Sequence, residues 1–201
     1  MKRRNQLAAF CLSIAMVSGS VFGGAVSAAA QETETEAVTQ EQAATKTITD
    51  AYGEEVEIPA EVKSIAATMC PIPSVIFTVT GSGDAIKTMA EGSMEAYNIS
   101  MFKVLCPGLE DLPTNCLDSA NNITFEELAK VEPDVILCNE AVEQELGEQM
   151  RAIGAVPVKM KFGEFTDVQE LIRIIGEIFD CEDRAAELID FQKGILSYLD
   201  E

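Results

Sequence analysis

The chain has 201 residues, of which 34 are acidic and 14 basic, so its net charge at neutral pH is −20. A surface this anionic repels phosphate backbones, and we do not expect nucleic acid as a partner. The sequence contains no histidine, which removes the commonest general base and a leading transition-metal ligand. Composition therefore argues against nucleic-acid binding, histidine-dependent catalysis and a bare zinc or manganese site.

The N-terminus has the pattern of an export signal. Three basic residues, Lys2 to Arg4, precede an apolar run from about Leu7 to Val26, and small residues follow. This order predicts a signal peptide over residues 1–30, whereas a membrane anchor is less favoured because serines and glycines interrupt the run. We expect an exported protein, periplasmic, extracellular or associated with the cell surface, that is soluble once the signal is cleaved. An uncleaved signal would instead tether it.

The chain after the signal divides into a tether and a domain. Residues 31–45 are rich in Glu, Thr, Gln and Ala without apolar periodicity, which predicts an acidic flexible linker. The remainder is long enough to bury one hydrophobic core. We place a single lobe at residues 46–180.

The first half of this lobe alternates strands and helices. Alternating apolar residues around Tyr52-Gly53 predict a β-hairpin from Lys46 to Pro59. A buried strand (64–69), a helix (74–80) and a second strand (85–90) should follow. The segment Gly81-Ser82-Gly83-Asp84 resembles a phosphate loop, but it follows a helix, so we expect it to be the turn that ends that helix.

The second half continues the alternation. Thr124-x-x-Glu127 and Thr166-x-x-Gln169 have the spacing of reciprocal helix caps. The expected elements are a short helix (93–104), a loop (106–119), a helix (124–130), a strand (134–138), a helix (140–153), a strand (156–160), a helix from 166, and a last helical stretch over 181–201. This order predicts an α/β fold, a doubly wound lobe with a short, mostly parallel four-stranded sheet.

Several motifs resemble those of the substrate-binding proteins of ABC importers for iron-siderophore complexes, haem and cobalamin. The segment Thr49 to Pro59 matches the hairpin pattern T-D-x-x-G-x-x-V-x-x-P, and Gly81 to Asp84 matches a Gly-x-Gly-Asp turn. Leu112-Pro113 followed by Thr124 to Val135 is similar to the pattern N-x-E-x-I-x-x-L-x-P-D-x-V. Departures from it include Thr124 for Asn and Val131 for Leu.

The resemblance implies a protein of two lobes joined by a long helix, with the solute held between them. Residues 181–201 would begin that interlobe helix, and the second lobe is missing from this sequence. The expected role is capture of a ferric siderophore, haem or cobalamin and delivery to an ABC permease, by a monomer without a cofactor or catalytic activity. A noncatalytic exported sensor or surface-binding module on the same fold is the alternative. In the family, a glutamate at the position of Glu126 contacts the permease. The equally weighted alternative is that Glu126 is a solvated carboxylate favoured by the helix dipole.

Ligands of doubly wound sheets lie beyond the carboxyl ends of the strands. We therefore expect the solute to contact residues that follow the strands, with a plain loop or core role as the alternative for each. The candidates are Met69, Cys70, Pro71, Ser93, Met94, Asn139 and Lys161, and further ones are Ile72, Glu91, Cys138, Glu140 and Phe162. Lys161 is the main cation offered to an anionic chelate, and Met69 or Met94 could ligate haem iron through sulfur.

Five cysteines remain after removal of the signal, and an odd number leaves at least one free thiol or an intermolecular pair. Cys106 and Cys116 enclose a loop and are the expected disulfide. Cys70 and Cys138 follow strands that a doubly wound sheet could place side by side, so a second bridge there stays open.

Overall fold

A computed structural model describes residues 44–117 and 122–199, so the expected signal peptide (1–30) and nearly all of the expected linker (31–45) lie outside the described residues. Its centre is a parallel sheet of four strands in the order β4-β3-β5-β6. The strands are β3 (Ile65–Ala67), β4 (Ile86–Met89), β5 (Val135–Asn139) and β6 (Val156–Met160). The predicted α/β class and the four parallel strands are confirmed, and the bounds predicted for the last strand are those observed.

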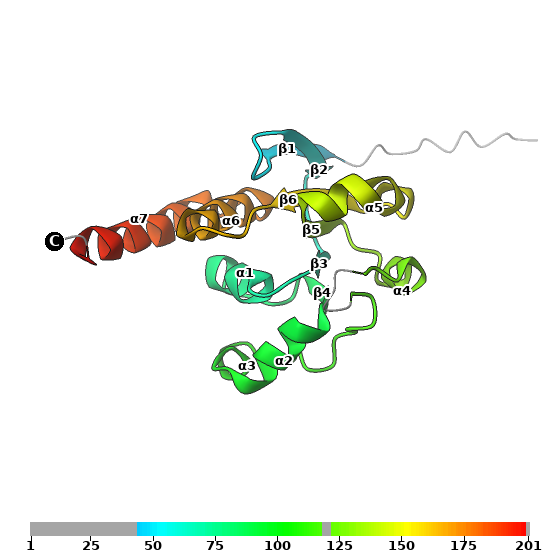
Figure 1. The fold of residues 1–201 in the computed structure, drawn as a ribbon, viewed down its shortest axis with the longest axis horizontal. Helices are drawn as coiled ribbons and strands as arrows, with labels where there is room; N and C mark the ends of the chain where they lie inside the picture. The colour runs from blue at the N-terminus through cyan, green and yellow to red at the C-terminus, as the bar shows by residue number, and fades with distance from the viewer. Residues whose placement is uncertain (1–43, 118–121, 200–201) are drawn as a thin grey trace, which may run out of the picture. The chain divides into compact units, whose positions relative to one another are not determined.

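Helices cover both faces of this sheet, as Figure 1 shows. The helices are α1 (Ile72–Thr80), α2 (Glu91–Ile99), α3 (Phe102–Leu105), α4 (Phe125–Val131), α5 (Glu140–Ala152), α6 (Phe165–Ile178) and α7 (Glu182–Leu199). α1, α6 and α7 lie on one side of the strands and α4 and α5 on the other. The lobe is therefore doubly wound, as the alternation of elements predicted.

Strand β5 supplies both hydrophobic cores because its side chains alternate between the two faces. Val135 and Leu137 belong to the core under α1 and α6, whereas Ile136 and Cys138 belong to the core under α4 and α5. All four are fully buried. A strand with helices on both sides has no polar face, which explains its unbroken apolar run.

The expected hairpin forms from β1 (Thr45–Thr49) and β2 (Glu55–Pro59), which pair antiparallel. Its turn is organised by the buried carboxylate of Asp50, whose Oδ1 accepts the backbone N–H groups of Tyr52 and Glu54 at 2.8 and 2.9 Å. Gly53 has a φ of 82°, a conformation that glycine adopts without strain. A further hydrogen bond, from Ala51 N–H to the Lys159 carbonyl at 3.1 Å, ties the turn to β6.

Several helix ends differ from the predictions in their capping. α4 begins where expected, but the Thr124 side chain caps nothing, and the Glu127 carboxylate is bound instead by Asn115 and Lys130. The reciprocal cap of α6 is formed by Glu164 and Asp167, two residues before the predicted pair. The choice among neighbouring polar residues depends on contacts from outside the helix, which spacing alone does not contain.

Two further boundaries were wrong or incomplete. The expected helix over 93–104 is two helices, α2 and α3, separated at Ser100 and Met101. α1 begins two residues before the prediction because its first turn accommodates Pro73, whose missing N–H would have no partner there. The prediction for Gly81 is confirmed: with a φ of 76° it ends α1, and its N–H donates to the Phe77 carbonyl at 2.8 Å.

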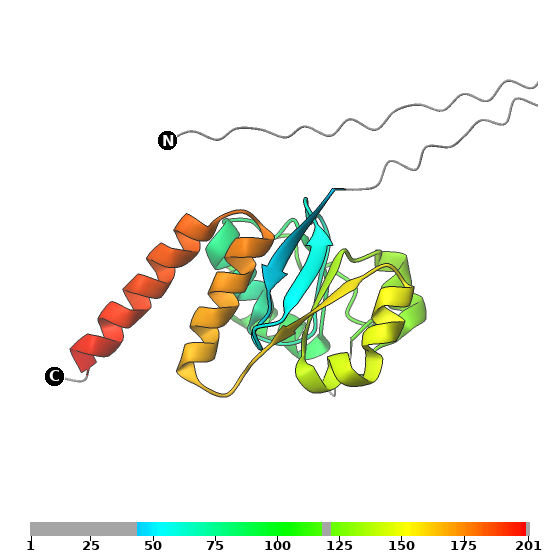
Figure 2. The ribbon, with the colours of Figure 1, turned by 90° about the horizontal axis from the view of Figure 1, so that it is seen from above.

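Helix α7 packs closely against α6 only near its start, and the two helices lie side by side in Figure 2. A Cβ placed on Gly176 of α6 would lie 2.7 Å from the Cβ of Ala185. Later in α7, the side chains of Phe191 and Ile195 are 68% and 46% exposed. In the described residues no helix is long and apolar enough to cross a membrane.

Replacing Gly176 with leucine should destabilise the lobe by about 1–3 kcal/mol, because the added atoms force α6 and α7 apart. Urea unfolding followed by circular dichroism would measure the change. Gly194→Ala is the matched control, since a Cβ there meets no atom within 4 Å. It should stabilise α7 by up to about 1 kcal/mol, and a neutral Gly176→Leu would show that the helices do not need this close approach.

Candidate functional site

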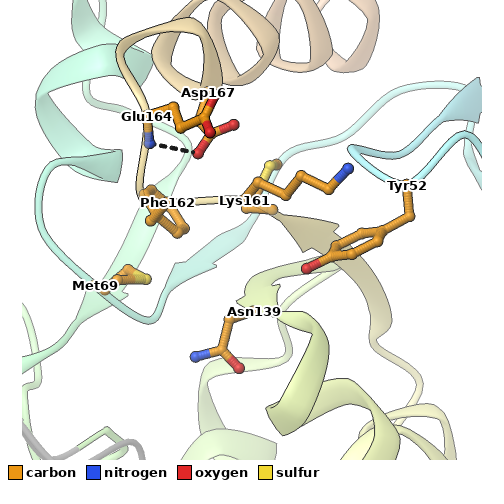
Figure 3. Close-up of a pocket in the computed structure, with 8 residues that line it drawn as sticks. Tyr52, Met69, Asn139, Lys161, Phe162, Glu164 and Asp167 are labelled. Carbon is orange, nitrogen blue, oxygen red and sulfur yellow. Dashed lines mark hydrogen bonds between the residues drawn. The ribbon is translucent and has the colours of Figure 1, made fainter.

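A cavity of about 530 Å³ opens at the carboxyl end of β5 and β6, which is where the topology predicted a ligand. We call it the strand-end cavity (Figure 3). Its lining residues are Tyr52, Met69, Asn139, Met160, Lys161, Phe162, Glu164 and Asp167. Four of the predicted site residues, Met69, Asn139, Lys161 and Phe162, are thus brought together at the ends of three different strands.

Asn139 has two tasks at this edge of the sheet. It is the last residue of β5 and the N-cap of α5, where its Oδ1 accepts the Val142 N–H at 2.9 Å. The cap fixes the side chain, and the amide nitrogen points away from the helix in Figure 3. Because the amide is held in one orientation, its NH₂ group can donate to a solute with little further loss of conformational freedom.

Lys161 provides a positive charge at the cavity. Its side chain extends toward Tyr52 (Figure 3), and its Nζ lies 4.4 Å from the centre of that ring, a cation–π contact. The two carboxylates that line the cavity, Glu164 and Asp167, are engaged in capping α6, with Asp167 accepting the Glu164 N–H at 2.9 Å. The lysine is therefore the lining group best suited to an anionic part of a solute.

Tyr52 was missed as a site residue, because a hairpin turn far away in sequence gives no sign that it reaches β6. Its position depends on Lys159, a buried lysine whose ammonium lies 3.3 Å from Asp50 and 2.7 Å from Glu54, with the Tyr52 ring 5.3 Å away. Partial burial, followed by the negative charge of Glu140, raises the pKa of the Tyr52 phenol. A hydrogen bond with the Glu140 side chain acts in the same direction, so the phenol proton is shared with that carboxylate.

The remaining predicted residues lie elsewhere. Cys70, Pro71 and Ser93 line a second, separate cavity between α1 and α2. Met94 is half-buried, packs against the core on the α1 side and lines neither cavity. A role for Met94 as a ligand of haem iron is not supported, whereas the Met69 sulfur remains available at the strand-end cavity.

The expected disulfide between Cys106 and Cys116 is absent, and both thiols are free. The reason is that Cys106 packs into the core on the α1 side of the sheet and Cys116 into the core on the α4 side. The second possible bridge is absent too: β3, which precedes Cys70, and β5, which contains Cys138, are neighbours, yet Cys70 is exposed, Cys138 is buried, and both thiols are free.

Glu126 lies exposed in the first turn of α4. Within the described part of the chain it takes part in no ion pair, whereas its neighbour Glu127 is bound by Lys130 at 2.6 Å. Metal-binding clusters of three or more Cys, Asp or Glu side chains are not found in residues 44–117 and 122–199.

A doubly wound lobe with a cavity at the carboxyl edge of its sheet is the architecture of one half of a solute-binding protein. Residues 108–197 match the family model described as periplasmic binding protein. The chain is therefore similar to the periplasmic binding protein family over this segment. The proteins matched bind solutes and are not enzymes, which agrees with the expectation from the missing histidines.

Solved structures show the same fold. A periplasmic solute binding protein from Veillonella parvula is 32% identical, with a TM-score of 0.74, over 77% of this chain and 47% of that one. Two others share the fold at 18% identity: MolA of Haemophilus influenzae bound to molybdate (TM-score 0.58, 72% of this chain, 49% of that one) and SirA of Staphylococcus aureus complexed with staphyloferrin B (0.54, 73% and 46%).

The chain spans about half the length of each of these three structures. MolA is bound to molybdate and SirA to staphyloferrin B, so the same fold serves more than one kind of solute. A comparison with curated protein sequences gives no match.

Proposed function

We propose that this chain is the first lobe of the extracytoplasmic solute-binding component of an ABC importer. The solute is a metal chelate, such as a ferric siderophore, haem or cobalamin, which is held between this lobe and a second one and delivered to a permease. The observation that carries the proposal is the convergence of Met69, Asn139 and Lys161 on one cavity at the carboxyl edge of the sheet. Residues 1–30 would direct export, 31–45 would act as the linker, and α7 would begin the connection between the lobes.

The chemistry of the cavity favours a chelated metal over a bare ion. The whole sequence lacks histidine, and the cavity offers one amide, one ammonium group, one phenol, a thioether pair and an aromatic ring beside two carboxylates that cap a helix. These groups suit shape recognition and a few hydrogen bonds to an organic ligand. In a chelate the metal already has its ligands, so the protein need not supply them.

Isothermal titration calorimetry of the complete protein with ferric siderophores, haem and cobalamin would test the proposal. We expect saturable binding of one of these classes with a stoichiometry near one, as a single cleft requires. Failure of all three to bind would refute the proposal.

We further propose that Glu126 contacts the permease, on the basis of its exposure and its lack of an ion-pair partner in the described residues. Glu126→Arg should leave solute affinity unchanged and reduce uptake into cells by about tenfold, because a like charge placed against a cationic surface is repelled. Asp190→Arg, at an exposed position on α7, carries the same charge change and should transport normally. Equal uptake by both variants would show that Glu126 does not contact the permease and is only a solvated carboxylate at the start of α4.

A further inference from the structure

The cavity between α1 and α2 differs in chemistry from the strand-end cavity. It has a volume of about 320 Å³, within the range of small-molecule sites. Its lining residues are Cys70, Pro71, Pro73, Ser74, Ser93, Ala96, Tyr97, Ser100, Met101 and Phe102. None of these residues is Asp, Glu, Lys or Arg, whereas the strand-end cavity has a lysine and two carboxylates. We call it the α1–α2 cavity.

Two packed aromatic rings line one side of this cavity. The Tyr97 ring is 1% exposed and meets the Phe102 ring edge-on, with their centres 5.3 Å apart. The Tyr97 hydroxyl is already satisfied, because it donates toward the Cys106 carbonyl and the Glu110 carboxylate at 3.0 and 2.9 Å. What Tyr97 offers to the cavity is therefore its ring.

Ser93 supplies a polar atom without a partner. The residue is 5% exposed, and its Oγ makes no hydrogen bond within the described part of the protein. A buried hydroxyl left unpaired costs about 1–3 kcal/mol, so proteins keep few of them. Because Ser93 lines the cavity, a ligand atom placed there would satisfy it.

The two cavities adjoin along the chain. Met69 lines the strand-end cavity, and the next two residues, Cys70 and Pro71, line the α1–α2 cavity. A solute lying across this short segment could reach both. Its polar part would meet Lys161 and Asn139, and its apolar part would meet the rings of Tyr97 and Phe102.

We propose that the α1–α2 cavity is an apolar subsite that takes an uncharged aromatic or aliphatic group of the solute, with one polar atom bound by Ser93 Oγ. The proposal rests on the proposed function, since it assigns the cavity to the same solute. It narrows the solute to an amphipathic chelate, with a polar metal-binding end and an apolar arm or edge.

Titration of the complete protein with the neutral dye N-phenyl-1-naphthylamine tests the subsite directly, because the dye has two aromatic units and one N–H. We expect saturable fluorescence enhancement. The sulfonated analogue 1-anilinonaphthalene-8-sulfonate should bind at least about tenfold more weakly, because burying its charge beside uncharged side chains is unfavourable. Absence of saturable binding by the neutral dye would overturn the proposal.

Three variants locate the site where the dye binds. Ala96→Phe places a ring in the cavity and should abolish binding, whereas Glu95→Phe, at the adjacent exposed position of the same helix, should not. Ser93→Ala should weaken the dye by about threefold to tenfold while leaving the melting temperature unchanged or higher, because it removes an unpaired buried hydroxyl. If Ala96→Phe fails to fold, the dye affinity of Ser93→Ala tests the proposal by itself. An affinity equal to that of the native protein would count against the proposal.

The two proposals can fail separately. Binding of a chelate without binding of the dye would reject the apolar subsite and leave the importer function in place. Binding of the dye by a protein that ignores all three chelate classes would reject the importer function, and with it the assignment of this cavity to the chelate.

Discussion

Lys159→Met is expected to lower the free energy of unfolding of the lobe by about 3 kcal/mol, the scale found when one partner of a buried ion pair is removed. The loss arises at Asp50, whose side chain is fully buried and whose Oδ2 has the Lys159 ammonium as its partner. Without the lysine, a carboxylate is left buried and only half satisfied. Chemical unfolding at pH 7 would measure the change.

The exposed pair of Lys63 and Glu61, with side chains 71% and 78% accessible, provides the control. Lys63→Met should cost no more than about 0.5 kcal/mol, because water screens such pairs. Equal losses of unfolding free energy in the two variants would show that the buried pair stabilises the lobe no more than an exposed pair does.

The same pair predicts a pH dependence. Burial lowers the pKa of Lys159, but the hydrogen bonds with Glu54 and Asp50 outweigh it, so the pKa lies above its ordinary value. A raised lysine pKa stabilises the folded state below the unfolded pKa, and this stability is lost as pH rises through the folded value. The gap between the native protein and Lys159→Met should therefore persist at neutral pH and begin to close only above about pH 10.4.

Lys161→Met should weaken the binding of an anionic ferric chelate by about tenfold to a hundredfold, because a hydrogen bond to a charged group contributes about 1.5–3 kcal/mol. Lys161 makes no ion pair in the described residues, so its charge is available to the solute. The fold should be unaffected, since the side chain is exposed. Calorimetry with the chelate that binds the native protein would give the change in affinity.

Lys193→Met, at an exposed position on α7, removes the same charge far along the chain from the cavity and should bind normally. Equal weakening in both variants would indicate a general field effect, and no weakening in either would exclude Lys161 from the site. A weakening confined to Lys161→Met would place the anionic end of the solute beside Tyr52.

The sequence was sufficient for the elements and their order because the evidence for them is local or periodic. The apolar run of β5 and the turn at Gly81 each depend on neighbouring residues, and both predictions are confirmed. Helix capping was predicted less well, since the Glu127 carboxylate is drawn to Asn115 and Lys130 instead of closing a cap on Thr124. Competition of this kind is decided by tertiary contacts.

The site was predicted in part for the same reason. The rule that ligands lie beyond the carboxyl ends of parallel strands led to Met69, Asn139, Lys161 and Phe162, because it needs only the strand ends. Tyr52 reaches the cavity because Asp50 is anchored to Lys159. These two residues are more than a hundred positions apart, so no local sequence pattern predicts their contact. The separation of the candidates into two cavities likewise depends on how α1 packs beside α2.

The exposed thiol of Cys70 has a practical consequence. The other four described cysteines are buried or half-buried, and burial raises the pKa of Cys138 to about 12 and also raises those of Cys106, Cys116 and Cys181. Thiols react as thiolates, so among these five cysteines a maleimide fluorophore added near neutral pH would attach chiefly at Cys70. The attached fluorophore would lie at the α1–α2 cavity, one residue along the chain from Met69 of the strand-end cavity, and its emission should change when the solute binds.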